Sequence, residues 1–248
     1  MTKPLRDWLS VDVGAVRRMA VQFLVERHFF RDPCRPVYSD PELFFSPADG
    51  VIVYVREVMP DEPLVHIKGM PYSLHTALRD PGFKAESLVI GIFMTFYDVH
   101  VNRIPYAGHL NYRELEPIDS YNLPMLDVEK ELLEQLGPFG HDARYLFTNQ
   151  RVVNCIYSTE LGQPYYVLQI ADYDVDSITP FRIKQNQHFA QNQRFSQIRF
   201  GSQVDLVIPL SERYEFRPLV ATGLHVEAGI DPLVRIIDRN GTTTTGVH

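Results

Sequence analysis

Short runs of β-branched and aromatic residues recur along the chain, and they limit its possible folds more than any other feature. Six such runs are predicted to be strands: 51–55, 88–96, 152–158, 165–170, 204–208 and 219–226. The chain has 18 prolines and 14 glycines, and these residues typically mark turns between strands. The pattern predicts an α+β fold, made mainly of antiparallel β-sheet with a helical N-terminus and a few short helices.

The N-terminal segment 1–35 is predicted to be helical. From about Val13 onward its apolar residues fall on one stripe: Val16, Met19, Ala20, Phe23 and Leu24. Arg17, Arg18 and Arg27 flank this stripe. A helix of this kind most often packs on the protein core, which is the favoured interpretation. The alternative is a helix lying on an anionic membrane surface, with its arginines toward the headgroups.

Length and composition exclude several classes of protein. The 248 residues suit one domain, 1–248. Two further helices are predicted within it, at 72–78 and 127–136. The net charge of -7 argues against a nucleic-acid partner. The two cysteines, Cys34 and Cys155, exclude a disulfide framework and a four-cysteine zinc site. The N-terminus lacks the apolar core of a secretory signal, so we expect a cytoplasmic protein.

Three short motifs could carry chemistry, although each also has a structural interpretation. They are S-P-A-D-G at 46–50, Y-D-V-H-V-N-R-I-P at 97–105 and R-F-G-S-Q-V-D at 199–205. The first is typical of a turn and the third of a bulge or bend. A lone histidine is most often a hydrogen-bonded structural residue. Asp98 and His100 could also begin a metal site on one face of a strand, with further ligands from scattered histidines.

The order of these motifs is more informative than any one of them. S-P-A-D-G at 46–50, I-K-G-x-x-Y-S-L at 67–74, F-Y-D-V-H-V-N-R-I-P at 96–105 and F-G-S at 200–202 follow one another. This succession resembles the phosphatidylserine decarboxylase family. Residues 146–153 and 226–233 add weaker matches, so the resemblance spans most of the chain.

The resemblance implies a proenzyme that cuts itself between Gly201 and Ser202. The Oγ atom of Ser202 would attack the Gly201 carbonyl carbon and convert the peptide bond into an ester. β-Elimination would then release the β chain, 1–201, and leave a pyruvoyl group at the start of the α chain, 202–248. By motif match, His100 is the base that activates Ser202 and Asp49 is the carboxylate that orients it.

The same resemblance implies the reaction and its partners. The pyruvoyl ketone, derived from Ser202, would form a Schiff base with phosphatidylserine, and loss of CO₂ would give phosphatidylethanolamine. His100 is the candidate proton donor for that step. No separate cofactor and no metal is expected. A phospholipid substrate requires peripheral contact with a membrane, here its inner face, and the family also implies a homodimer of processed chains.

Departures from the family pattern leave alternatives open. Many members have two histidines three positions apart, whereas this chain has His100 and Arg103, so the histidine for each step is not fixed. The segment 191–196 lacks the family's usual stretch before the cut, and Gln203 replaces a common threonine. One alternative is a pyruvoyl-dependent decarboxylase of a water-soluble amino acid. Another is a scaffold that has lost processing.

Overall fold

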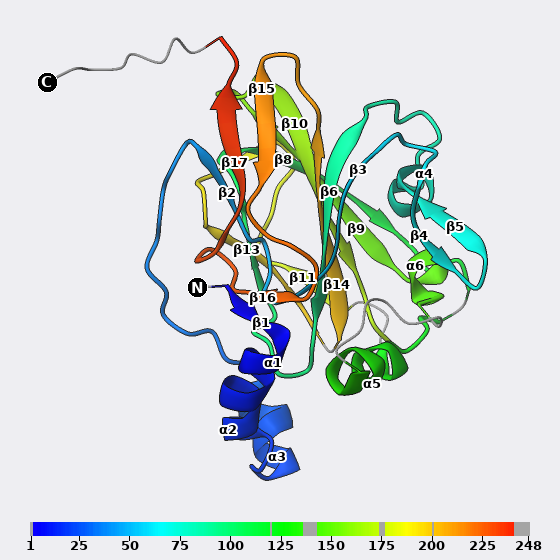
Figure 1. The fold of residues 1–248 in the computed structure, drawn as a ribbon, viewed down its shortest axis with the longest axis vertical. Helices are drawn as coiled ribbons and strands as arrows, with labels where there is room; N and C mark the ends of the chain where they lie inside the picture. Colours follow the sequence, from blue (N-terminus) through cyan, green and yellow to red (C-terminus); the bar gives the residue numbers. More distant parts are fainter. Residues whose placement is uncertain (1, 120, 136–142, 174–176, 200, 241–248) are drawn as a thin grey trace, which may run out of the picture.

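A nine-stranded antiparallel sheet dominates the structure, a computed structural model that describes residues 2–119, 121–135, 143–173, 177–199 and 201–240 (Figure 1). Its strands, in spatial order, are β1 (Lys3–Pro4), β16 (Leu224–Val226), β3 (Gly50–Val58), β6 (Ser87–Met94), β14 (Ser202–Pro209), β10 (Gln163–Ile170), β9 (Arg151–Ser158), β8 (Gly108–Leu115) and β12 (Gln187–Phe189). The predicted α+β fold with mainly antiparallel sheet is confirmed.

Three smaller antiparallel sheets flank the large one. One contains β11 (Ile178–Pro180), β13 (Arg194–Ile198) and β7 (Val101–Arg103). A second contains β15 (Tyr214–Pro218), β17 (Pro232–Asp238) and β2 (Leu43–Phe45), and the third pairs β4 (Pro63–Ile67) with β5 (Met70–Ser73). Strand β7 follows the end of β6, and β13 precedes the start of β14. The first small sheet is therefore connected to β6 and β14 at the same end of the large sheet.

Both faces of the central strands are covered, which explains why these strands are almost wholly apolar. In β6, Leu88, Ile90 and Ile92 join one core cluster, whereas Val89 and Phe93 join the other. Side chains of a strand alternate between its two faces, so one strand serves both cores. Burial on both faces holds the strand ends in place, and the motifs lie at those ends.

Several sequence predictions differ from the structure at their boundaries; the strand predicted at 88–96, for example, ends at Met94. Helix α4 covers only Leu74–Leu78, because residues 72 and 73 belong to β5. The predicted strand 219–226 is reduced to β16, because Gly223 adopts a positive φ of 87° just before it. Helix α5 (Leu126–Gln135) confirms the predicted helix at 127–136, whose last residue, Leu136, lies outside the described residues. Helix α6 (Tyr145–Thr148) was not predicted.

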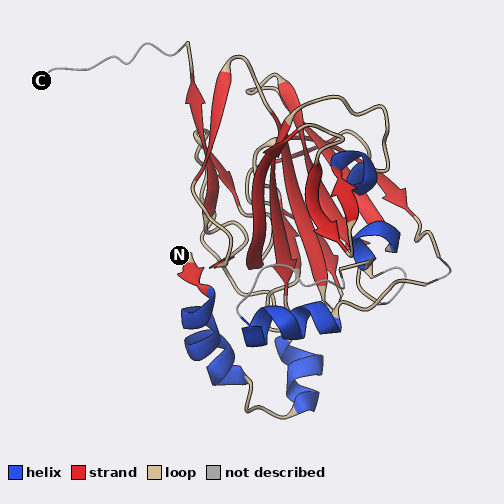
Figure 2. Ribbon diagram, turned by 45° about the vertical axis from the view of Figure 1, so that its right-hand side comes forward, coloured by secondary structure: helices blue, strands red, loops and turns tan. Residues whose placement is uncertain are grey.

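The N-terminal helical segment packs on the core only in part: Leu5, Trp8 and Val13 join a core cluster, whereas most of the predicted apolar stripe after them does not. It consists of α1 (Leu5–Trp8), the π-helical η1 (Leu9–Val13), α2 (Gly14–Val16), α3 (Val21–Phe23) and the π-helical η2 (Leu24–His28), with a break at 17–20. Of the predicted apolar stripe only Leu24 is buried, whereas Met19 and Phe23 are exposed. These helices gather with α5 at one end of the sheet (Figure 2). None of the helices described is long and apolar enough to cross a membrane.

Candidate functional site

The sequence motifs converge at one end of the large sheet. Strand β6 ends at Met94, and its antiparallel neighbours β3 and β14 begin there, at Gly50 and Ser202. Met94 lies directly opposite Ser202 in the register. The S-P-A-D-G turn, the loop after β6 and the Gly201–Ser202 pair are therefore neighbours, although more than 150 residues separate the first from the last.

Ser202 is buried at the start of β14, and the residue before it lines a cavity. The Ser202 hydroxyl donates a hydrogen bond to Met94 Sδ over 3.4 Å. Gly201 lies on the cavity wall, where an added Cβ would be 2.9 Å from a carboxylate oxygen of Asp172. Glycine therefore fits at position 201 without displacing Asp172, and the predicted scissile bond joins a cavity-lining residue to a buried serine.

His100 is buried in a neutral form with one nitrogen lone pair available. Its Nε2 lies 3.0 Å from the Thr95 carbonyl oxygen. A carbonyl only accepts hydrogen bonds, so Nε2 carries the proton and Nδ1 carries the lone pair. Nδ1 is buried and has no hydrogen-bond partner among the described residues. Burial lowers the pKa of His100 to about 4, and the ring of Phe29 packs against it at 4.2 Å between centroids.

Asp49 is bound to an arginine, and it makes no hydrogen bond to His100. Its two carboxylate oxygens accept hydrogen bonds from Arg35 Nη1 and Nη2, both at 2.6 Å. One of them also accepts the backbone N–H of Ala228 at 2.7 Å. A bidentate guanidinium is a stronger partner than a neutral imidazole, which explains this arrangement. The expected carboxylate–histidine pairing at Asp49 is therefore absent from the described residues, where the Thr95 carbonyl orients His100.

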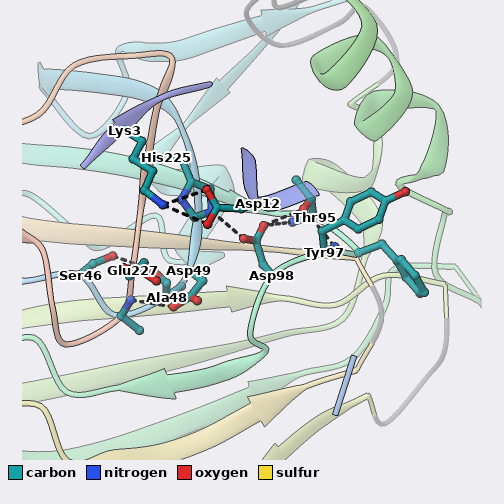
Figure 3. Close-up of polar contacts among 12 residues, drawn as sticks. Lys3, Asp12, Ser46, Ala48, Asp49, Thr95, Tyr97, Asp98, His225 and Glu227 are labelled. Carbon is teal, nitrogen blue, oxygen red and sulfur yellow. Dashed lines mark hydrogen bonds and ion pairs between the residues drawn. The ribbon is translucent and has the colours of Figure 1, made fainter. Parts of the chain in front are cut away.

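A different carboxylate–histidine pair lies at this end of the sheet, between Asp98 and His225 (Figure 3). Asp98 Oδ1 lies 2.6 Å from His225 Nε2, and Oδ2 accepts hydrogen bonds from the backbone N–H and hydroxyl of Thr95, both at 2.8 Å. Burial lowers the pKa of His225, but the Asp98 carboxylate outweighs it, so the pKa lies above its usual value. Burial likewise raises the pKa of Asp98, but His225 and Thr95 outweigh it and leave the pKa lowered.

Sequence reasoning missed this pair because its members are 127 residues apart. Asp98 was expected on an extended strand beside His100, but residues 95–98 form a turn in which the Asp98 N–H donates to the Thr95 carbonyl. His225 also stacks on Trp8 of α1, with ring centroids 4.2 Å apart and planes 11° apart. One feature of the sequence could have indicated the pair: His225 is a polar residue inside a run, 219–226, that is otherwise typical of an apolar strand.

Two cavities open beside these residues. The larger, of about 930 Å³, is mainly apolar and extends from the N-terminal helices to α5 and the strand ends; its lining includes Leu9, Val13, Phe96, Glu129, Asp172 and Gly201. The smaller, of about 400 Å³, surrounds the Asp98–His225 pair and includes Arg31 and Arg35. The larger cavity is the one that reaches the predicted cleavage site.

The metal-site interpretation gains no geometric support. Asp98 faces His225 and Thr95, and the imidazole of His100 faces the Thr95 carbonyl. Within the described parts of the chain, no group of three or more histidine, cysteine, aspartate or glutamate side chains is arranged to hold a metal ion. Arg103, at the position of the second histidine in many family members, donates a hydrogen bond to the Asn192 carbonyl at 3.1 Å.

Comparison with known proteins identifies the class to which this fold and site belong. The family model described as phosphatidylserine decarboxylase matches residues 24–232. A phosphatidylserine decarboxylase proenzyme from Erythrobacter litoralis is 33% identical over 209 residues, covering 84% of this chain and 72% of the relative. One from Cupriavidus taiwanensis is 30% identical over 200 residues, covering 81% and 73%.

One similar protein is named for a different lipid substrate. The protein of Methanothermobacter thermautotrophicus, provisionally named archaetidylserine decarboxylase proenzyme, is 30% identical over 217 residues, covering 88% of this chain and 82% of the relative. The chain belongs to the phosphatidylserine decarboxylase family, which confirms the resemblance drawn from its motifs.

Proposed function

We propose that this protein is a self-cleaving, pyruvoyl-dependent decarboxylase that converts phosphatidylserine into phosphatidylethanolamine and CO₂. The observation that carries the proposal is the position of the Gly201–Ser202 bond, between a glycine on the wall of a large apolar cavity and a serine buried at a strand start. A reactive group made at residue 202 would be beside a space large enough for a substrate.

For processing, we propose that His100 Nδ1 accepts the proton of the Ser202 hydroxyl as its Oγ attacks the Gly201 carbonyl carbon. The support is that Nδ1 is a buried lone pair with no hydrogen bond in the described structure, on a neutral ring. Ser202 Oγ must leave its contact with Met94 Sδ to react, and catalytic hydrogen bonds often tighten only in the reacting complex. Asp49 would keep the S-P-A-D-G turn in place through its hydrogen bonds with the Arg35 guanidinium and the backbone N–H of Ala228.

The residues around position 202 fit a pyruvoyl group. Ser202 pairs with Met94 of β6, and the following residue pairs with Ile170 of β10, so the new chain end would stay in the sheet after the cut. A pyruvoyl group at residue 202, held by the pairing of β14 with β6 and β10, would supply an electrophilic ketone and an electron sink for decarboxylation. The chain itself would position the substrate and exclude water.

The surface beside the cavity supports a lipid substrate. The N-terminal helical segment exposes apolar side chains, among them Val11, Met19, Val21, Phe23 and Val25. Arg17 and Arg18 on the same segment are also exposed. Apolar side chains edged by arginines are typical of a segment that lies in an anionic membrane interface. We propose that this segment contacts the inner face of the membrane and lets a phospholipid headgroup reach the cavity.

The substrate is tested by measuring CO₂ release from vesicles containing carboxyl-labelled phosphatidylserine, with labelled free L-serine as the competing substrate. We expect release from the vesicles and none from free serine. The Ser202→Ala variant is the matched control and should release nothing. Release from free amino acids alone would favour the water-soluble alternative. A wild-type chain that stays uncut and inactive would favour the scaffold. The homodimer implied by the family stays a prediction, which native mass measurement would test.

A further inference from the structure

Glu129 is a carboxylate inside the cavity that the proposed processing chemistry does not use. It lies on α5, whose other described acidic residues, Asp127, Glu131 and Glu134, are exposed or half-buried. Glu129 is only 7% exposed, yet its side chain lines the same cavity as Gly201. Helix α5 therefore turns one carboxylate inward, toward the wall that contains the predicted cleavage site.

The surroundings of Glu129 leave its charge uncompensated. One oxygen accepts the backbone N–H of Phe96 at 3.0 Å. In the described chain no lysine or arginine forms an ion pair with it, and the neighbouring Lys130 pairs with Asp127 instead. Burial, together with the nearby carboxylates of Asp98 and Asp172, raises the pKa of Glu129 to about 7. A buried carboxylate is costly unless a cation accompanies it, and the cavity is where a cation could enter.

The other charged groups around the cavity are Arg17, Lys130, Glu134 and Asp172. Arg17 follows α2, and Lys130 and Glu134 lie on α5 itself, all of them exposed. Asp172 follows β10 and accepts the backbone N–H of Met125 at 2.7 Å. The interior of the cavity is therefore acidic, and its basic side chains are in contact with solvent. These carboxylates would favour a substrate orientation in which the ammonium of the headgroup points into the cavity.

We propose that Glu129 receives the primary ammonium of the substrate in this cavity and removes one proton from it. The N–H bond breaks, its electron pair stays on nitrogen, and the proton forms an O–H bond on the Glu129 carboxylate. The amine then has the lone pair that it needs to react at residue 202. This proposal rests on the proposed function, and it assigns to Glu129 the recognition of the substrate amine.

The kinetic test compares Glu129→Gln with Glu131→Gln, a variant on the same helix that does not line the cavity. We expect Glu129→Gln to lower kcat/KM for phosphatidylserine by about 10²-fold or more, as for loss of a general base. The wild-type kcat/KM should rise with pH through about 7 as the carboxylate ionises, and Glu129→Gln should lack that limb. Glu129→Asp should restore part of the activity. Self-cleavage should proceed in all variants.

A binding measurement gives a readout that does not depend on turnover. In the uncut Ser202→Ala chain, short-chain phosphatidylethanolamine carries the ammonium, and short-chain phosphatidylglycerol is the matched lipid without it. We expect Glu129→Gln to weaken binding of the first by about tenfold, the scale of one charge-assisted hydrogen bond, and to leave the second unchanged. Equal weakening of both lipids, or of neither, would overturn the assignment.

The outcomes separate this inference from the proposed function. If the wild-type chain is cut but releases no CO₂ from phosphatidylserine, the proposed substrate is wrong, and the binding measurement still tests Glu129. If the wild-type chain is active and Glu129→Gln matches it in kcat/KM and pH profile, only the role of Glu129 is wrong. If Glu129→Gln also stops self-cleavage while remaining folded by circular dichroism, its role is not specific to the substrate amine.

Discussion

His100 and His225 lie near the same end of the sheet and are buried to a similar degree, but their surroundings give them opposite proton chemistry. His100 donates to a backbone carbonyl, no carboxylate of the described residues is bonded to it, and its pKa falls to about 4. His225 is bonded to Asp98 at 2.6 Å, and its pKa is raised. Burial alone therefore does not define a histidine's role: the bonded partner decides whether the ring is a neutral base or half of an ion pair.

The contrast predicts that the two histidines differ most in catalysis. His100→Gln should lower the rate of self-cleavage, of decarboxylation or of both by about 10²- to 10⁴-fold, because it removes the proposed general base. His225→Gln should cause a much smaller loss. Gel analysis of processing and a CO₂ assay with phosphatidylserine vesicles measure the two steps. A larger loss in His225→Gln than in His100→Gln would reverse the roles assigned here.

The second prediction concerns stability and uses the uncut Ser202→Ala chain, so that unfolding involves one polypeptide. Asp98→Asn should lower the free energy of unfolding by about 3–5 kcal/mol, because it leaves His225 buried without its anion. Asp127→Asn is the control, since the Asp127 side chain is 82% exposed. Urea denaturation measures both. Similar midpoints for the two variants would mean that the Asp98–His225 pair is not a stabilising ion pair.

The third prediction is that the two histidines affect stability over different pH ranges. The lowered pKa of His100 means that unfolding takes up a proton below about pH 6.5, so stability falls as the pH drops toward 4, by of the order of 3 kcal/mol. The raised pKa of His225 stabilises the fold below about pH 6.5, and this contribution disappears as the pH rises through its folded pKa.

Urea denaturation of the Ser202→Ala chain across this pH range separates the two effects. The stability difference between the parent and His100→Gln should increase with pH between about 4 and 6.5. The difference between the parent and His225→Gln should decrease with pH above about 6.5. If both differences had the same slope, the two rings would share one protonation behaviour, and the contrast between them would be lost.

The smallest predicted effect is spectroscopic and uses Trp8, the single tryptophan of the chain. Its ring stacks on His225 at 4.2 Å, and a protonated imidazole quenches indole fluorescence. Emission should therefore increase as the pH rises through the raised pKa of His225. Trp8→Leu should lower the free energy of unfolding of the chain with His225 protonated by about 0.5–2 kcal/mol, because the cation–π contact is lost. A fluorescence titration that persists in His225→Gln would show that another group is responsible.

The sequence could predict the central strands β3, β6, β14, β10 and β9, because apolar runs reflect burial on both faces of the sheet, but it did not predict less apolar strands such as β8. The order of the family's motifs also predicts that Gly201, Ser202 and His100 act in one site, which the proposed function adopts. The sequence could not predict the bonding within the site. Which carboxylate pairs with which histidine depends on the register of strands far apart in the chain, and on competition from Arg35 for Asp49.

The N-terminal segment shows a second limit. Its apolar periodicity predicted a helix correctly, but periodicity does not say what the apolar side chains contact. Met19 and Phe23 have the spacing of core residues, yet both are exposed in the structure. The break at residues 17–20 has no proline or glycine to announce it. The first part of the segment does pack on the core, through Trp8 and Val13, and the exposed apolar residues that follow are the ones that the proposed membrane contact would use.

The most direct test of the account is the intact mass of the purified wild-type protein under denaturing conditions, with the Ser202→Ala chain beside it. Self-cleavage predicts two fragments, residues 1–201 and 202–248, with the smaller lacking a free amino terminus and therefore resisting Edman degradation. The variant should remain one full-length chain. A wild-type protein that stays full-length, even after incubation with phosphatidylserine vesicles, would contradict the cleavage at Gly201–Ser202 on which the proposed function depends.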